Sequence, residues 1–171
     1  TILKRKGQVI GFIIMIIVCC VCLKSNSTNN YHHNKILQIN LDKIYSSIET
    51  ACADLTDSEK EFKTVADNLV DDCYISVKTI CALGEDKYDL KEFRGFLLDL
   101  SSVDAYTSEQ KEQITESLDA IHQAFESISW RSTKGLGAGV TGEYDFLLND
   151  CKEVNKIVAV MNHAEIQIAA D

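Results

Sequence analysis

The chain contains no proline among its 171 residues. Proline breaks helix interiors and is common in turns and at sheet edges, so its absence favours long, uninterrupted helices. Apolar residues form 46% of the sequence and charged residues 25%, as is typical of a folded protein rather than a disordered one. The length fits one domain, or one domain plus an appendage, and the composition predicts long helices with short polar connections.

Apolar residues recur at spacings of three and four, which is the pattern of one helical face. This pattern predicts helices over about 34–53, 56–83, 107–130 and 143–169, and a shorter one over about 90–100. The residues expected to face the core are Leu37, Leu41, Ile44, Ile48, Cys52, Phe62, Ala66, Leu69, Cys73, Val77, Ile80, Leu90, Phe93, Phe96, Leu97, Leu100, Ile114, Leu118, Ile121, Phe125, Ile128, Leu147, Cys151, Val154, Val158, Met161 and Ile168.

Helix boundaries are also marked in the sequence. Thr56–Glu59 and Thr107–Gln110 both fit the capping box, in which two residues satisfy each other's backbone N–H groups at a helix start. Gly84 suits the position just after a helix end. We therefore predict an all-α fold over residues 34–171, an up-and-down helical bundle of four long helices plus one short helix.

The N-terminal segment, residues 1–25, combines a basic start with a short apolar run. Lys4, Arg5 and Lys6 precede the run from Val9 to Leu23, which would rise about 22 Å as a helix, less than the 30 Å or so of a bilayer core. This favours a cleaved secretory signal peptide. The alternatives are an uncleaved membrane anchor, or a helix whose cysteines are acylated or buried.

Residues 26–33 are small and polar, and we predict a disordered spacer there. Asn26-Ser27-Thr28 in this spacer is a candidate glycosylation site on Asn26. Together with the signal-like segment, it places the bundle outside the cytosol. We expect a secreted protein, or a membrane-anchored one with an extracytoplasmic domain if residues 9–23 are retained.

The cysteines outside the apolar run are Cys52, Cys73, Cys81 and Cys151. An even number in a secreted chain predicts two disulfides that staple the bundle. Cys73 and Cys81 lie about 12 Å apart along one predicted helix, too far to bond to each other, so each would bond to Cys52 or Cys151. The alternative is that some of them are buried free thiols.

A glycine-rich stretch with Gly135, Gly137, Gly139 and Gly142 spells the G-x-G-x-x-G of dinucleotide-binding folds. That motif binds phosphate only between a strand and a helix, and no strand is predicted before it. We interpret the stretch as a flexible loop between helices, with a hinge or a partner-contact tip as the alternative.

Motifs of catalysis and metal binding are missing from the sequence. Neither a nucleophile motif nor a metal-ligand spacing is present, so we predict no enzyme activity, no cofactor and no metal site. Asp71 and Asp72 are interpreted as a solvated helix face. His163, near the end of the last predicted helix, is interpreted as a helix-end cation that interacts favourably with the helix dipole.

The net charge of −9 argues against nucleic acid and anionic membrane surfaces as partners. A protein partner, of unknown identity, is compatible with this charge. A small apolar ligand is also possible in a bundle, since amphipathic helices can enclose a cavity.

One stretch resembles a known family. Ile48-Glu49-Thr50-Ala51-Cys52 is similar to the start of the first cysteine helix of plant invertase and pectin methylesterase inhibitors, and Asp72-Cys73 and Asp150-Cys151 resemble their Asp-Cys positions. The resemblance implies a secreted, disulfide-stapled four-helix bundle that inhibits an enzyme. The family's second cysteine has no counterpart, and the gap from Cys81 to Cys151 departs from its spacing.

The sequence thus predicts a secreted, non-enzymatic helical bundle that binds a macromolecular partner, as an extracellular effector or an enzyme inhibitor does. The alternatives are a carrier of lipid or another small apolar ligand, and a membrane-anchored ectodomain.

Overall fold

The computed structural model describes residues 2–83, 88–127 and 151–164. Within the first helix, the side chains that it describes are those of residues 15–19, 32–33 and every residue from 35 to the helix end. These parts of the chain are mostly helical and contain no strand, so the all-α prediction is confirmed for them. The helices are α1 (Ile2–Leu55), α2 (Phe62–Ala82), α3 (Lys91–Ser102), α4 (Ser108–Ser127) and α7 (Cys151–Met161).

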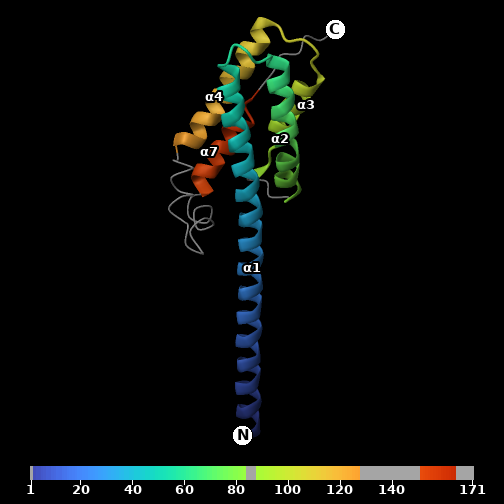
Figure 1. The fold of residues 1–171 in the computed structure, drawn as a ribbon. Coiled ribbons are helices and arrows are strands. Elements are labelled where there is room, and N and C mark those ends of the chain that lie inside the picture. Colours follow the sequence, from blue (N-terminus) through green and yellow to red (C-terminus); the bar gives the residue numbers. More distant parts are fainter. Residues whose placement is uncertain (1, 84–87, 128–150, 165–171) are drawn as a thin grey trace.

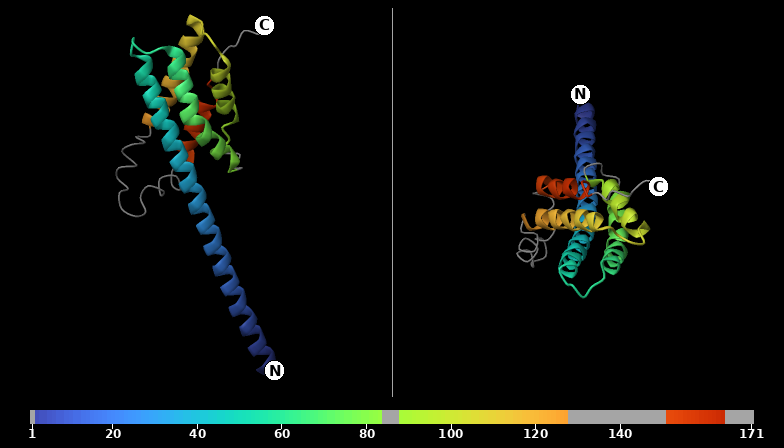
Figure 2. Two further views of the ribbon diagram at one scale, coloured as in Figure 1. Left: turned by 45° about the vertical axis from the view of Figure 1, so that its right-hand side comes forward. Right: turned by 90° about the horizontal axis from the view of Figure 1, so that it is seen from above.

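The helices pack side by side in the order α3, α2, α1, α4, α7 (Figures 1 and 2). α1 therefore lies between α2 and α4. Among its described side chains, burial begins at Leu37, so the C-terminal part of α1 belongs to the bundle. The N-terminal half of α1 projects away from the other helices as a single rod (Figure 1).

The core follows the predicted apolar stripes. Of their described members, Cys52 and Phe62 are partly buried at the edge of the core, and the others are buried. Tyr45, Tyr88 and Ile157 were not among the predicted core residues and are almost fully buried as well. Each helix therefore turns its apolar face inward, and burial of that face supplies most of the stability of such helices.

Tyr45 links α1 to α4 through three contacts. Its ring lies 5.0 Å from the Phe125 ring and stacks on the His122 ring at 5.9 Å, measured between centroids. Its hydroxyl donates a hydrogen bond to the carboxylate of Glu126. A buried tyrosine needs such a partner for its hydroxyl, and here the partner comes from the neighbouring helix.

The spacer predicted at residues 26–33 is instead helical, within α1. Adding a residue to an existing helix costs much less than starting one, so a helix can continue through serine and asparagine when both flanks are helical. Neither glycine nor proline occurs between Phe12 and Leu83 to stop it. The prediction of a disordered spacer is therefore wrong.

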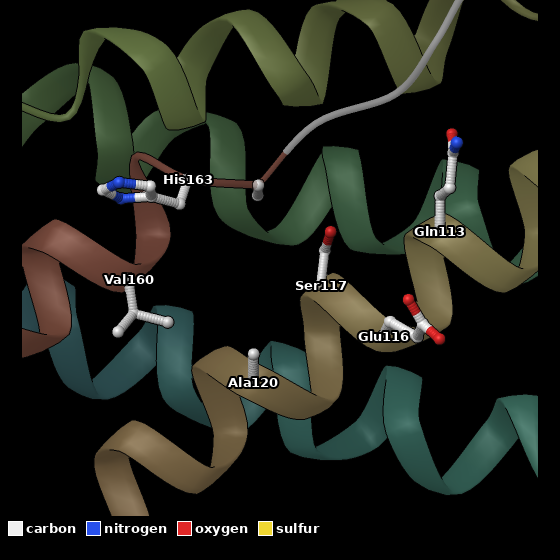
Figure 3. Close-up of a pocket in the computed structure, with 7 residues that line it drawn as sticks. Gln113, Glu116, Ser117, Ala120, Val160 and His163 are labelled. Atoms are coloured by element: carbon white, nitrogen blue, oxygen red, sulfur yellow. The ribbon is translucent and has the colours of Figure 1, made fainter.

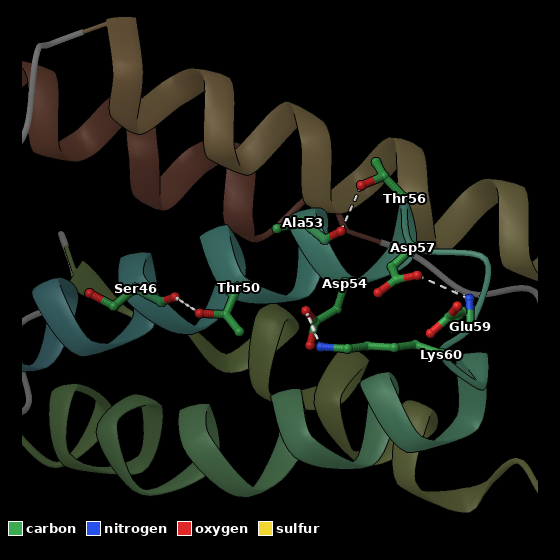
Figure 4. A network of polar contacts seen from close by, with 8 residues as sticks. All are labelled: Ser46, Thr50, Ala53, Asp54, Thr56, Asp57, Glu59 and Lys60. Atoms are coloured by element: carbon green, nitrogen blue, oxygen red, sulfur yellow. Dashed lines mark hydrogen bonds and ion pairs between the residues drawn. The ribbon is translucent and has the colours of Figure 1, made fainter.

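The capping box predicted at Thr56 does not start α2, which begins at Phe62 after Glu61, a residue that makes no side-chain cap. The hydroxyl of Thr56 donates back to the carbonyl of Ala53 at 2.6 Å, and the Asp57 carboxylate accepts from the backbone N–H of Glu59 at 3.0 Å (Figure 4). These residues form the turn that ends α1, not the first turn of α2.

The second capping box is present at the start of α4. The backbone N–H of Thr107 donates to the side chain of Gln110 at 2.9 Å, and the N–H of Gln110 donates to the Thr107 hydroxyl at 3.2 Å. This reciprocal pair satisfies two backbone donors, as the sequence predicts.

The last helix is shorter than predicted at its C-terminal end. α7 stops at Met161, and the N–H groups of His163 and Ala164 bond to carbonyls three residues earlier, which tightens the chain into a turn. The expected continuation to residue 169 is wrong at this point. Gly84 and residues 128–150, including the predicted ends at 130 and 143, lie outside the described residues.

Candidate functional site

A surface groove lies between α4 and the C-terminal end of α7 (Figure 3). Its volume is about 310 Å³. The residues that line it are Gln113, Glu116, Ser117, Ala120, Val160, His163 and Ala164. We call it the α4–α7 groove. We call its polar lining side chains (Gln113, Glu116, Ser117 and His163) the rim and its small apolar ones (Ala120, Val160 and Ala164) the floor; such a mixed surface is suitable for recognising another molecule.

The α7 side of the groove is held in place by Asn162. The side-chain carbonyl of Asn162 accepts a hydrogen bond from the backbone N–H of Phe93 at 3.2 Å. Its side-chain amide donates to the backbone carbonyl of Asp89 at 2.7 Å. Since Phe93 lies in the first turn of α3, these two bonds tie the end of α7 to the start of α3.

His163 is one of the groove residues and lies just beyond Met161, the last residue of α7. Its Nδ1 lies 2.6 Å from the carbonyl oxygen of Ala159, one of the carbonyls that lack a partner within the helix. Because a carbonyl only accepts, Nδ1 carries a hydrogen and donates it to Ala159. The position predicted for His163 near a helix end is confirmed, and the predicted positive charge stays a prediction.

Ser117 and His163 both line the groove, which raises the question of a nucleophile and its base. They come from different helices, and the His163 ring points away from Ser117 (Figure 3). No hydrogen bond joins the two side chains in the part of the chain that the structure describes. A base must reach its nucleophile, so this pair lacks the geometry of nucleophilic catalysis.

The outer face of α4 carries three exposed carboxylates, Glu109, Glu112 and Glu116. We call them the α4 acidic ridge. Spacings of three and four place them along one side of the helix, and Glu116 is also a groove residue. The regular spacing of the three glutamates makes the ridge visible in the sequence. The groove could not be found there, because it depends on where α7 packs against α4.

A second hollow, of about 240 Å³, lies between α1 and α2. Asp54, Asp71 and Asp72 are its acidic lining residues. Asp54 pairs with the ammonium group of Lys60 at 2.5 Å (Figure 4). Asp71 and Asp72 are exposed, as expected for a solvated face, and no group of three or more metal-ligating side chains occurs among the described residues.

The predicted disulfide staple is not supported. Cys52, Cys73 and Cys81 are free thiols. Burial, followed by the nearby charge of Asp119, raises the pKa of Cys52 to about 12, and burial raises that of Cys73 to about 12 as well. Such thiols stay protonated and pack as small apolar groups, which is the alternative that the sequence left open.

Several other predicted features lie outside the described residues or side chains. The glycine-rich loop with Gly135, Gly137, Gly139 and Gly142 falls in residues 128–150. The side chains of Asn26 and Cys151 are likewise not described, so the glycosylation site and the fourth cysteine remain predictions. Among the described side chains, no helical stretch is both long and apolar enough to cross a membrane.

Comparison of the chain with protein-family models, curated proteins and solved structures gives no match. The function is therefore argued from the residues of this chain.

Proposed function

We propose that the protein is a non-enzymatic helical bundle that acts outside the cytosol by binding a macromolecular partner. The observation that carries the proposal is the α4–α7 groove, which is open at the surface and combines an apolar floor with a polar rim. Residues on both sides of it are solvent-exposed, among them Glu116, Ala120 and His163. A surface of this kind suits recognition of a protein, as an effector or an inhibitor requires.

The packing of the described core supports a surface partner over an enclosed apolar ligand. Leu41, Ile44, Ile48, Phe93 and Phe125, which come from three different helices, are all fully buried against the core. An apolar carrier needs interior space for its ligand, whereas the α4–α7 groove and the hollow between α1 and α2 both have exposed lining residues.

Site-specific photo-crosslinking in cells that produce the full chain tests the proposal. A crosslinking residue at the exposed position Ala120, in the groove, should give a discrete adduct with a second macromolecule. The same residue at exposed Ser101 on α3 is the matched control and should give none. Equal adducts at both positions, or none at Ala120, would contradict a partner at the groove.

A membrane-anchored ectodomain is the second candidate, and one observation favours it. Met15, Ile16, Ile17 and Val18 on α1 are all substantially exposed, with exposed fractions from 48% to 61%. Four consecutive positions point in different directions around a helix, so apolar side chains surround α1 at this level. Intact mass of the mature protein distinguishes the candidates. An N-terminus near Ser25 on a soluble protein indicates a cleaved signal, and retention of residues 9–23 in the membrane fraction indicates an anchor.

A further inference from the structure

We propose that the α4–α7 groove binds a basic amphipathic segment of a partner protein. An apolar side chain of that segment would lie on the groove floor, and its lysine or arginine side chains would lie along the α4 acidic ridge. The inference rests on the proposed function, because it names the chemistry of the partner that the function requires.

The floor of the groove accepts an apolar group. Ala120 on α4 and Val160 on α7 line the groove from its two sides (Figure 3). Ala164, which follows α7 in the chain, is also a lining residue. Val160 is partly exposed and Ala120 is exposed, so apolar surface remains open to solvent there. A volume of about 310 Å³ is at the lower end of the range of ligand sites, enough for side chains of a segment but not for a folded domain.

The charge beside this floor selects a cationic partner. Glu109, Glu112 and Glu116 are exposed on the same side of α4. Lys111 is the basic residue of α4, and its ammonium group lies over the ring of Phe62 at 5.6 Å, so it is directed toward α2 rather than the ridge. The α4 rim therefore presents negative charge, which attracts a basic segment.

The hydrogen-bonding capacity of Glu116 has the same preference. Its carboxylate oxygens accept hydrogen bonds, and lysine and arginine side chains only donate them, so a basic side chain matches Glu116 in hydrogen bonding as well as in charge.

The groove chemistry disfavours other ligand classes. Nucleic acid and anionic lipid would meet the repulsion of the acidic ridge and of the net charge of −9. A metal ion would find one carboxylate, Glu116, in the groove lining. A basic protein segment is the ligand that satisfies the floor and the rim together.

Fluorescence anisotropy with the full chain provides the test. The probe is a labelled amphipathic peptide of leucine and lysine, and its counterpart with glutamate in place of lysine is the negative probe. We expect binding of the lysine peptide only, with an affinity that falls between about 50 mM and about 300 mM salt. Failure of the lysine peptide to bind would overturn this inference but leave binding of another partner open, which the crosslinking experiment tests separately.

Three variants locate the binding. Glu116→Lys should weaken it about tenfold at low salt, since a rim charge of the wrong sign slows association. Ala120→Phe, which fills the floor without a charge change, should also weaken it. Asp71→Lys on α2 changes the net charge by the same amount as Glu116→Lys and should have a much smaller effect.

Two outcomes with these variants would contradict the proposal. Equal losses in Glu116→Lys and Asp71→Lys would mean diffuse attraction to an acidic protein. A loss in Asp71→Lys alone would place the peptide in the hollow between α1 and α2. Either result would overturn the assignment to the α4–α7 groove. Circular dichroism of each variant confirms that the helices persist, since all three positions are exposed.

Discussion

Replacement of Asn162 by alanine tests whether a side chain beyond the end of α7 caps α3. The N-cap residue of α3, Leu90, makes no side-chain cap. The N–H of Lys91 bonds to the Asp89 carboxylate at 3.2 Å, and the N–H of Phe93 bonds to Asn162 at 3.2 Å. Asn162 thus takes the place of a local capping residue, although it lies 69 residues away in the sequence.

The magnitude follows from the two bonds that Asn162→Ala removes. A hydrogen bond contributes roughly 0.5–1.5 kcal/mol net, and loss of a helix cap costs roughly 0.5–2 kcal/mol. Both Asn162 bonds are partly buried, so water only partly replaces them. We expect a loss of about 2 kcal/mol in the free energy of unfolding, or about 4–8 °C in Tm for a chain of this size.

Denaturant titration and amide hydrogen exchange measure this effect, with Asn155→Ala as the matched control. Asn155 is an exposed residue of the same helix, and alanine there should be neutral or slightly stabilising because it has the higher helix propensity. Asn162→Ala should also speed exchange of the Phe93 amide. Equal stability of the two variants, or unchanged exchange at Phe93, would refute the capping role.

Three further predictions concern the core, the α4 cap and the thiols. Ile121→Asp should cost several kcal/mol in a denaturant titration, because it places an unpaired charge at a fully buried position, whereas Glu112→Ala on the exposed face should change stability by less than about 0.5 kcal/mol. Thr107→Ala should lower stability by about 1 kcal/mol through loss of the capping box, measured as a lower Tm. Cys73 should resist alkylation at pH 8 until the protein is unfolded, since its pKa of about 12 keeps it protonated. Because that pKa is raised on folding, the stability it contributes is present below about pH 9 and is lost as the pH rises toward 12.

Features that depend on local contacts could be predicted from the sequence. The apolar stripes gave the core faces because a helix places residues three and four apart on one side. Thr107 and Gln110 are three residues apart, so their reciprocal bonds form as soon as α4 does. The box at Thr56 failed for an equally local reason, because its hydroxyl bonds to Ala53 and the ion pair of Asp54 with Lys60 stabilises a turn.

Features that depend on tertiary packing could not be predicted in this way. The number of cysteines outside the N-terminal apolar run is even, which suggests disulfides. Only the packing of α1 against its neighbours shows that Cys52 and Cys73 are separate free thiols. The α4–α7 groove likewise joins Glu116 and His163, which are far apart in the chain, and it depends on where Asn162 fixes the end of α7. Spacing along one helix contains no information about the residues of another.

The α4 acidic ridge connects stability with the proposed binding. Like charges three or four residues apart disfavour a helix by roughly 0.2–0.5 kcal/mol per pair, so Glu109, Glu112 and Glu116 include two unfavourable pairs. Glu109 is partly compensated by its place in the first turn, where the helix dipole favours an acid, but Glu116 lies two turns further on. Glu116→Lys should therefore raise stability slightly while it weakens binding of the basic peptide. If the ridge had only a structural role, Glu116→Lys would instead lower stability and leave peptide binding unchanged.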